Sequence, residues 1–170
     1  VIGFGGVGSC LVASAKARGA GKISVLDLSD KSVIAFELGA TGYWQGLGVL
    51  PHDTPFDVII DTTGHRETMS SVLKALAPGG RFVMVGQPKA REDLVVTNVP
   101  HFFEGSGKSI MASQGGGFEP TRDIPRYLSM YQTSNIRLER IITHRFRLPQ
   151  INEAIELMKR GEAGRIFIDF

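Results

Sequence analysis

The sequence predicts an α/β fold built on a doubly wound parallel sheet, with helices on both of its faces. Three observations favour it. Short apolar runs typical of buried strands alternate with segments of helical spacing, which is the pattern of βαβ units. A glycine-rich turn separates the first apolar residues from the first helical segment. Further glycines follow two later strands, at the end of the sheet where open α/β folds bind ligands.

Length, charge and cysteine content exclude several classes of protein. A chain of 170 residues suits one sizeable domain, or one domain and part of another. Its net charge of +2 includes no basic block, so we expect neither nucleic acid nor a membrane as partner. No apolar run approaches the roughly 20 residues of a membrane span, and no signal peptide is recognisable. The single cysteine, Cys10, is expected to be a small buried residue in a reducing, cytoplasmic protein.

The first half of the chain is predicted to alternate helices and strands after an incomplete first strand. The sequence opens with Val1-Ile2 and reaches a glycine turn at Gly3, so we expect a truncated strand and a piece of a longer chain. Glycines mark where helices end, and unbroken apolar runs mark buried strands. The expected elements are a helix over 7–18, a strand over 22–28, a helix over 30–38 capped by Ser29, an edge strand and loop within 40–55, and a buried strand over 56–62.

The second half continues the alternation and changes character near its end. Pro78-Gly79-Gly80 is expected to close a helix over 67–77. The elements expected after it are strands over 81–85, 93–98 and 109–112, a helix over 124–133, a strand at 141–142, a helix over 151–160 and a strand over 165–169. The one predicted domain boundary lies near residues 135–138 and divides the chain into 1–137 and 138–170.

The opening turn, Gly3-Phe4-Gly5-Gly6-Val7-Gly8, matches the G-x-G-x-x-G fingerprint of dinucleotide binding. Gly3 permits the tight turn, Gly5 lets the backbone approach a pyrophosphate, and Gly8 lets the helix pack on the sheet. The helix N-terminus then offers N–H groups and a partial positive charge to the phosphates. Asp27, about 20 residues beyond the loop, can accept both adenosine ribose hydroxyls and would repel a 2′-phosphate. The motif therefore predicts a Rossmann-type site with NAD favoured over NADP.

A methyltransferase is the competing interpretation of this pattern. Methyltransferases also carry a glycine loop and an acid after the second strand, and the run from Leu76 to Phe82 looks like theirs. Their loop, however, resembles G-x-G-x-G, which would need glycine in place of Val7. Their leading acid precedes the first glycine, where this chain has Ile2. The dinucleotide interpretation fits both positions and is preferred.

Two later turns are also candidates for the ligand side of the sheet. Thr63 and Gly64 follow the strand predicted over 56–62, and Gly86 ends the next strand after Val85. Ligands bind outside the carboxyl ends of strands in open α/β sheets, so both turns should face the cofactor. The alternative is that Gly64 and Gly86 are ordinary turn glycines.

Together these features resemble the cofactor-binding half of the medium-chain dehydrogenase family, which contains the zinc-dependent alcohol dehydrogenases. The resemblance covers nearly the whole chain. The matching segments are Gly3 to Gly8, Asp27, Glu37 to Thr41, Asp57 to Gly64, Leu76 to Gly86, Gly116 to Phe118, Ile142 to Phe146 and Ile151 to Ala154. The resemblance implies a Rossmann-type NAD-binding domain over 1–137 and a segment over 138–170 that belongs to a catalytic domain. The family's GroES-like zinc domain has no counterpart in this sequence.

The resemblance also implies a role for each candidate cofactor residue. The residues implied are Gly3, Gly5, Gly6, Val7 and Gly8 at the pyrophosphate and nicotinamide, Asp27 at the adenosine ribose, Thr63, Gly64, Val85 and Gly86 beside the nicotinamide, Ser113 or Gly115 at its carboxamide, and Arg165 at the pyrophosphate. A solvated strand residue is an equal alternative for Arg165. No catalytic residue is assigned in this chain.

Two departures from the family pattern limit what the chain can do by itself. A zinc-activated alcohol needs three protein ligands and an open position, and we expect no metal site here. The histidines, which show no metal spacing and are expected to be structural or at the surface, are His52, His65, His101 and His144. His65 follows Gly64, so a cofactor contact or proton relay is its alternative role. The segment from Gly42 to Pro55 is short for the family and is expected to lack a helix.

The function that the sequence favours is the NAD(H)-binding domain of an alcohol- or polyol-type oxidoreductase, inactive alone. Its substrate would be a small alcohol or carbonyl compound bound with the help of residues outside this chain. The alternatives are a zinc-independent quinone or enoyl reductase, and a non-catalytic module that binds NAD or scaffolds an assembly. The resemblance also suggests a homodimer that pairs sheet edges near residues 106–114.

Overall fold

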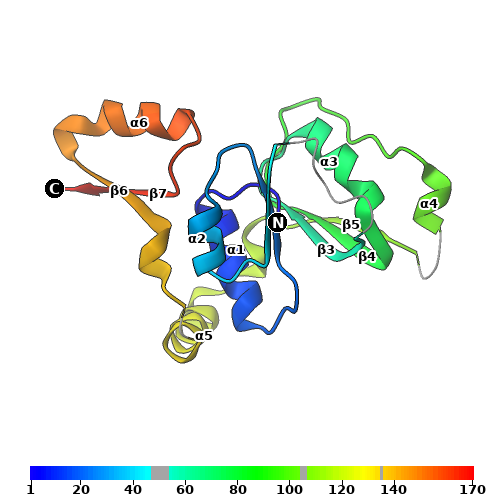
Figure 1. Cartoon of the computed structure of the whole chain (residues 1–170), viewed down its shortest axis with the longest axis horizontal. Coiled ribbons are helices and arrows are strands. Elements are labelled where there is room, and N and C mark those ends of the chain that lie inside the picture. The colour runs from blue at the N-terminus through cyan, green and yellow to red at the C-terminus, as the bar shows by residue number, and fades with distance from the viewer. Residues whose placement is uncertain (47–53, 104–106, 135) are drawn as a thin grey trace. The chain divides into compact units, whose positions relative to one another are not determined.

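The computed structural model describes residues 1–46, 54–103, 107–134 and 136–170. The chain forms two compact units, one of residues 1–2 and 47–118 and the other of residues 3–46 and 119–170. We call them the central unit and the terminal unit. Every strand pair in the described residues is parallel, and helices connect the strands (Figure 1). The predicted α/β class with parallel sheets is confirmed.

The N-terminal part of the terminal unit contains the glycine turn. Its elements are α1 (Gly6–Ala17), β1 (Ser24–Asp27), α2 (Ser32–Glu37) and β2 (Gly42–Gln45). The two strands pair in parallel, with Asp27 opposite Gln45. Val12 of α1 and Val25 of β1 are fully buried, so the helix packs its apolar side on the core. The helix predicted over 7–18, the strand over 22–28 and the edge strand within 40–55 are confirmed, while residues 47–53 of that last segment lie outside the described part.

The predicted Ser29 cap of α2 is wrong. The helix begins at Ser32 after Lys31, and the N–H of Ser32 donates to Oδ1 of Asp30 at 3.0 Å rather than to the side chain of Ser29. The backbone N–H of Ser29 is instead bound by the carboxylate of Asp27, at 2.9 Å from Oδ1. This hydrogen bond keeps the residues before α2 in a turn, so the helix starts later than its apolar pattern suggests.

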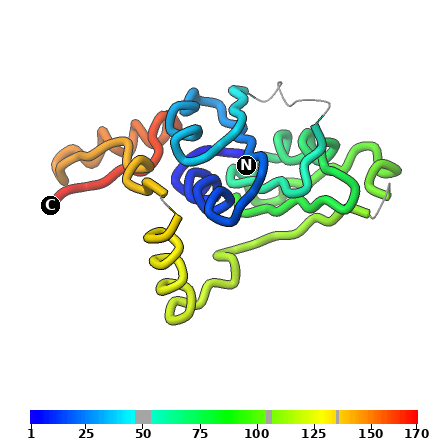
Figure 2. Tube along the Cα trace, turned by 60° about the horizontal axis from the view of Figure 1, so that its bottom comes forward, coloured from blue at the N-terminus to red at the C-terminus, as the bar shows by residue number. Residues whose placement is uncertain are grey.

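The C-terminal part of the terminal unit forms a second parallel pair. Its elements are α5 (Pro120–Thr133), η3 (Leu138–Ile141), β6 (Ile142–Arg147), η4 (Leu148–Gln150), α6 (Ile151–Lys159) and β7 (Arg165–Asp169). Figure 2 shows the chain leaving β6, turning through α6 and returning as β7 beside it. The helix predicted over 151–160 and the strand over 165–169 are confirmed. The strand predicted at 141–142 is longer, because β6 pairs with β7 as far as Arg147.

The central unit holds a three-stranded parallel sheet in the order β3-β4-β5. Its elements are β3 (Phe56–Asp61), α3 (Arg66–Val72), η1 (Leu73–Ala75), β4 (Leu76–Met84), α4 (Val99–Phe103), β5 (Ser109–Ala112) and η2 (Gly115–Gly117). Ile2 adds a single parallel bridge to Asp61. Phe82 is fully buried, and Met69 and Val72 of α3 are 1% exposed, so they form the core of this unit.

Two expectations about the start of this sheet are wrong. Helix α3 ends at Val72 rather than at 77, and Pro78-Gly79-Gly80 lies inside β4. There the register shifts, since Phe56 pairs with Leu76 but Val58 already pairs with Arg81. The extra residues of β4 form a bulge beside the first half of β3. Val58, predicted to be buried, is 40% exposed in that half of the strand.

The strand predicted over 93–98 is also wrong. Residues 92–97 form no ladder and Asn98 has a φ of 55°, after which α4 begins. Alternating apolar residues favour a strand only where a neighbour supplies hydrogen bonds, and these residues have no strand neighbour in the described part of the chain. The predicted boundary near 135–138 includes Asn135, which lies outside the described residues, and the division into 1–137 and 138–170 stays a prediction.

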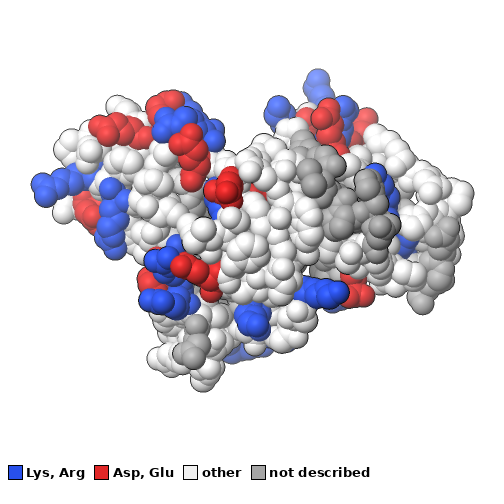
Figure 3. All heavy atoms as spheres, viewed as in Figure 1, with Lys and Arg blue, Asp and Glu red and all other residues white. Residues whose placement is uncertain are grey.

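The surface and the helices agree with the charge and hydropathy of the sequence. No helix in the described ranges is long and apolar enough to cross a membrane. On the face shown in Figure 3, most Lys and Arg side chains lie beside Asp or Glu side chains rather than in a separate basic patch. Ion pairs such as Arg140 with Glu37 (2.6 Å) and Arg145 with Asp169 (2.9 Å) account for part of this mixing.

Candidate functional site

The glycine turn of the terminal unit forms an open N-terminus of α1. Gly3 has a φ of 83°, a left-handed conformation that favours glycine, and its N–H donates to the carbonyl of Leu26 at 2.8 Å. Gly5 is the N-cap residue of α1, and no side chain caps the helix or places an acid in its first turn. A β-carbon built on Gly5 would meet no atom within 4 Å. The turn therefore leaves space beside the positive end of a 12-residue helix.

Arg165 lies against this turn although it comes from the last strand. A β-carbon on Gly6 would lie 2.8 Å from the guanidinium carbon of Arg165 and 3.0 Å from its Nη2. The arginine side chain can therefore approach this closely only because residue 6 is a glycine and has no side chain. A guanidinium and a helix N-terminus both carry positive charge and repel each other unless an anion lies near them. Their approach is the arrangement expected at a phosphate-binding turn.

Asp27, the predicted ribose ligand, ends β1 and accepts hydrogen bonds from the same turn. Its Oδ2 accepts the N–H of Phe4 at 2.5 Å, and its Oδ1 accepts the N–H of Ser29 at 2.9 Å. Phe4 is 2% exposed, so the contact anchors the glycine turn to the end of β1. An ionised carboxylate has about four lone-pair positions, which leaves capacity for a ribose hydroxyl.

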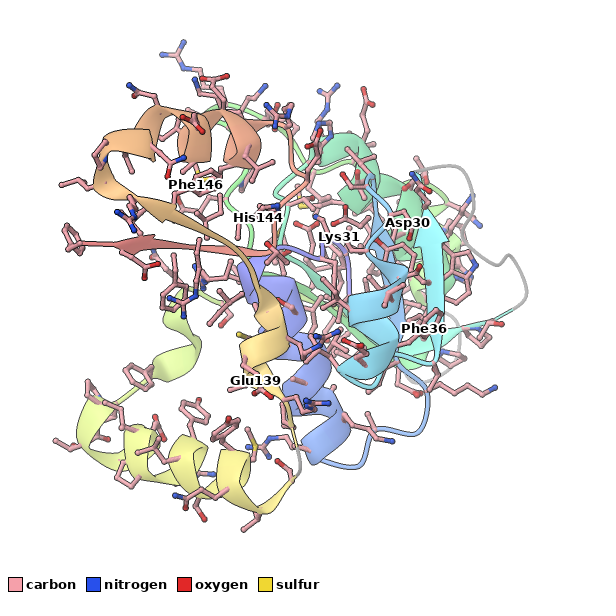
Figure 4. The ribbon with its side chains drawn as sticks, turned by 60° about the vertical axis from the view of Figure 1, so that its left-hand side comes forward. Asp30, Lys31, Phe36, Glu139, His144 and Phe146 are labelled. Atoms are coloured by element: carbon pink, nitrogen blue, oxygen red, sulfur yellow. The ribbon has the colours of Figure 1, made fainter. Side chains whose placement is uncertain are left out.

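Lys31 is a neighbour of Asp27 that the sequence interpretation missed. Its Nζ lies 3.4 Å from Asp27 Oδ1, and the two side chains are 8% and 11% exposed. Figure 4 shows Lys31 on the turn next to Asp30, directly before α2. The i,i+4 spacing of an acid and a base was the available signal. The ammonium offsets part of the negative charge that would otherwise repel a 2′-phosphate.

The predicted turns after β3 and β4 pack on each other within the central unit. A β-carbon on Gly64, whose φ is 67°, would lie 2.4 Å from the carbonyl oxygen of Gln87. A β-carbon on Gly86 would lie 2.2 Å from the backbone nitrogen of Gly64. Both glycines are therefore required by the contact between the two turns. Thr63 is exposed, and Val85 joins the turns by donating its N–H to the carbonyl of Asp61 at 2.8 Å.

The side chain of Asp61 organises this pair of turns and was missing from the predicted site. It is fully buried. Its Oδ1 accepts the hydroxyl of Thr63 at 2.7 Å, and its Oδ2 accepts the N–H of Gly64 at 2.8 Å. An acid that ends a buried strand directly before Thr-Thr-Gly was the available signal, since such a side chain commonly binds the following turn.

Ser113 and Gly115 follow β5 at the same end of the three-stranded sheet. The N–H of Ser113 donates to the carbonyl of Met84 at 2.8 Å. Gly115 has a φ of 73°, and a β-carbon there would meet no atom within 4 Å. Beside the first two turns lies a cavity of about 240 Å³, lined by residues that include Thr63, His65 and Lys89. His65 itself is exposed.

The described residues contain no group of three His, Cys, Asp or Glu side chains that could hold a metal ion. His52 lies outside the described part. His101 contacts Lys108 at 2.6 Å, and the ring of His144 stacks on Phe146 with centroids 6.3 Å apart. Cys10 is exposed, which corrects the expectation that it is buried. It lies away from the buried side of α1, which carries Ser9 and Val12.

The predicted cofactor residues therefore form two clusters, one in each unit. The terminal unit brings together the glycine turn, Asp27 and Arg165. The central unit brings together the turns of Thr63, Gly64, Val85 and Gly86, with Ser113 joined through Met84. Each cluster is described by itself.

Comparison with known proteins gives one family. A profile of the zinc-binding dehydrogenases matches residues 6–133. Alcohol dehydrogenase 6 of Peromyscus maniculatus is 32% identical over 97% of this chain and 46% of its own length. Alcohol dehydrogenase class-3 of Drosophila melanogaster is 30% identical over 100% of this chain and 48% of its own. The chain spans about half the length of the curated relatives it matches.

A solved structure shares the fold. Benzyl alcohol dehydrogenase from Acinetobacter calcoaceticus superposes with a TM-score of 0.88 at 23% identity, covering 98% of this chain and 48% of that protein. At this identity the likeness concerns the fold alone. It confirms the predicted Rossmann-type architecture.

Proposed function

Because the chain belongs to the zinc-binding dehydrogenase family, we propose that it is the NAD(H)-binding part of an alcohol- or polyol-type oxidoreductase. The observation that carries the proposal is the approach of Arg165 to Gly6 at the uncapped N-terminus of α1. Two positive groups at an open glycine turn favour a bound anion. The pyrophosphate of a dinucleotide supplies that anion, and Asp27 lies one hydrogen bond from the same turn.

The residues present fit the cofactor. Gly5 leaves the space that a pyrophosphate needs, α1 and Arg165 supply donors, and Asp27 has capacity for a ribose hydroxyl. We propose that Thr63, Gly64, Val85 and Gly86 contact the nicotinamide, with Ser113 or Gly115 at its carboxamide. When bound, NAD supplies the hydride acceptor. For an alcohol substrate this would be the acceptor that turns the alcohol into a carbonyl compound, and the role of these residues would be to bind and orient the dinucleotide.

This chain's own contribution is binding and orientation. The described residues contain no set of metal ligands, so no zinc step is assigned to them. The substrate, an alcohol or carbonyl compound, and any zinc would be held by residues beyond this chain. We therefore propose that the 170-residue chain alone binds NAD(H) and does not turn over simple alcohols.

The test is calorimetric titration of the chain with NAD and with NADP, for the wild type and for Asp27→Asn. We expect micromolar NAD binding, and roughly 10- to 150-fold weaker NAD binding by the variant, because a charged hydrogen bond of about 1.5–3 kcal/mol is lost. NADP binding should strengthen in the variant, since Lys31 then lies unpaired beside the 2′-phosphate.

Asp57→Asn is the matched control. It removes an exposed carboxylate near the start of β3, outside both clusters of candidate cofactor residues, and it should leave NAD affinity unchanged. Absence of NAD and NADP binding by the wild type would contradict the proposed function. Formation of NADH from a simple alcohol by the metal-stripped chain would contradict the proposed lack of turnover.

A further inference from the structure

The turn of residues 28–31, which we call the ribose turn, is held by side chains on both of its sides. It follows Asp27 and leads into α2. From β1, Asp27 Oδ1 accepts the N–H of Ser29 at 2.9 Å. From β2, the amide Nε2 of Gln45 donates to the carbonyl of Leu28 at 3.2 Å. Since turns expose backbone groups that otherwise bind water, these contacts restrict the conformations of the turn.

The closest of these contacts comes from Tyr43 of β2. Its hydroxyl donates to the carbonyl of Ser29 at 2.5 Å and accepts the N–H of Lys31 at 3.1 Å. One oxygen thereby bridges two backbone groups on either side of Asp30. Burial raises the pKa of Tyr43 to about 12, so the hydroxyl keeps its proton and both hydrogen bonds near neutral pH.

The ring of Tyr43 connects the same turn to the glycine loop. It meets the ring of Phe4 edge to face, with centroids 6.4 Å apart and an interplanar angle of 87°. The N–H of Phe4 donates to Asp27, and Lys31 forms an ion pair with Asp27. Tyr43 thus contacts residues before and after Asp27, and its hydroxyl binds the backbone of the turn rather than the carboxylate.

We propose that Tyr43 is a positioning residue for the adenosine ribose: its hydroxyl fixes the ribose turn, and thereby Asp27 and Lys31, in the arrangement that binds the ribose hydroxyls. The proposal rests on the proposed NAD site. A site held in its binding conformation before the ligand arrives loses less conformational entropy on binding. Removing the hydroxyl should therefore weaken the ribose contacts without altering the pyrophosphate contacts at Gly5, Gly6 and Arg165.

Tyr43→Phe tests this, because it keeps the ring contact with Phe4 and removes only the hydroxyl. The ligands are NAD and an NAD analogue that lacks the 2′-hydroxyl of the adenosine ribose. We expect NAD affinity to fall about three- to tenfold, the effect of one or two net hydrogen bonds. Affinity for the deoxy analogue, already weaker in the wild type, should fall clearly less. A general loss of protein stability would instead lower the affinities for NAD and for the deoxy analogue by the same factor.

Tyr131→Phe is the matched control, since its hydroxyl lies on α5 at 3.5 Å from Glu139, and it should not change NAD affinity. Gln45→Ala is a second variant at an exposed position. It should also lower the affinity for NAD, but by a smaller factor than Tyr43→Phe does. Amide hydrogen exchange without ligand gives an independent measure: the N–H of Lys31 should exchange faster in Tyr43→Phe than in the wild type.

The outcomes separate this proposal from the proposed function. If the wild type binds NAD and Tyr43→Phe binds it equally well, the positioning role is overturned and the NAD site stands. Equal weakening of NAD and the deoxy analogue also overturns it, because Tyr43 would then act through overall stability. If the wild type binds neither, both proposals fail together.

Discussion

At the scale of single residues, glycines serve two different purposes in this chain. Gly5 faces open space, whereas Gly86 faces the backbone of the neighbouring turn. The lack of a side chain at Gly5 leaves space for a ligand, whereas the lack of a side chain at Gly86 permits two turns to contact each other. The two purposes predict opposite effects for the same substitution by alanine.

Gly86→Ala should destabilise the protein and Gly5→Ala should not. The added carbon at Gly86 would lie 2.2 Å from the nitrogen of Gly64, so we expect a loss of about 1–3 kcal/mol or more in the free energy of unfolding. At Gly5, where φ is −85°, the cost should stay below about 1 kcal/mol. NAD affinity, however, should fall about tenfold, because the added methyl occupies the space proposed for the pyrophosphate.

Urea unfolding and NAD titration measure the two effects separately. Gly21→Ala is the control, since a β-carbon there also meets no atom within 4 Å but lies outside the turn. It should change neither quantity. Unaltered NAD binding by Gly5→Ala would show that the pyrophosphate does not bind at this turn.

At the scale of elements, the N-terminus of α5 depends on one carboxylate. Asp123 is 5% exposed, and its Oδ2 accepts the N–H of Glu119, the N-cap residue, at 2.9 Å. Hydrogen bonds from the Arg122 guanidinium and from that backbone N–H hold the pKa of Asp123 well below its usual range. Because its folded pKa is lowered, the carboxylate stabilises the helix above its unfolded pKa of about 3.9.

Acid should therefore remove the contribution of Asp123. The wild type should be more stable than Asp123→Asn at pH 6, and this difference should shrink as the pH falls below about 4 towards the lowered pKa. Thermal unfolding followed by circular dichroism across this range measures it. Glu119→Gln, at an exposed neighbouring acid, should show a smaller difference. A difference that stays constant down to pH 2 would contradict the assigned role.

Elements with a complete local pattern could be predicted from the sequence, and elements that depend on a partner could not. The helix after Gln150 has apolar residues at helical spacing, and β7 is bounded by Gly164, so both were placed almost to the residue. The bulge at Pro78-Gly79-Gly80 is set by pairing with β3, and residues 93–98 lacked a strand neighbour. In the candidate site, the glycine turn and Asp27 could be predicted from their spacing in the sequence. Lys31, Tyr43 and Asp61 could not, because their roles depend on contacts with the turn of residues 28–31 or with the turn of Thr63 and Gly64.

At the scale of the whole molecule, we propose a homodimer through the edge of the central sheet. β5 is the last strand in the order β3-β4-β5, and no strand pairs with its other side in the described residues. Ser106 of the proposed segment lies outside the described part. Met111, within β5, is 46% exposed. An uncovered strand edge is a template for pairing with a second chain.

Met111→Lys should weaken such a dimer, since a charge on an edge strand opposes pairing. Light scattering over a range of protein concentrations should show a dimer for the wild type and a shift towards monomer for the variant. Met158→Lys is the control, because it adds the same charge at a methionine of α6 that is 63% exposed. A wild type that stays monomeric at every concentration would rule out the dimer.

The contact of Arg165 with Gly6 joins two segments that lie far apart in the sequence, and this has a consequence for how the protein is made. Ribosomes deliver the N-terminus first, so the glycine turn emerges while the strand that carries Arg165 has yet to be translated. The terminal unit is assembled from residues 3–46 and 119–170, and residues 47–118 are translated between them. The glycine turn of the nascent chain therefore meets Arg165, the first residue of β7, only after residues 47–164 have been translated, and a ribosome halted before Arg165 would carry a turn without its arginine.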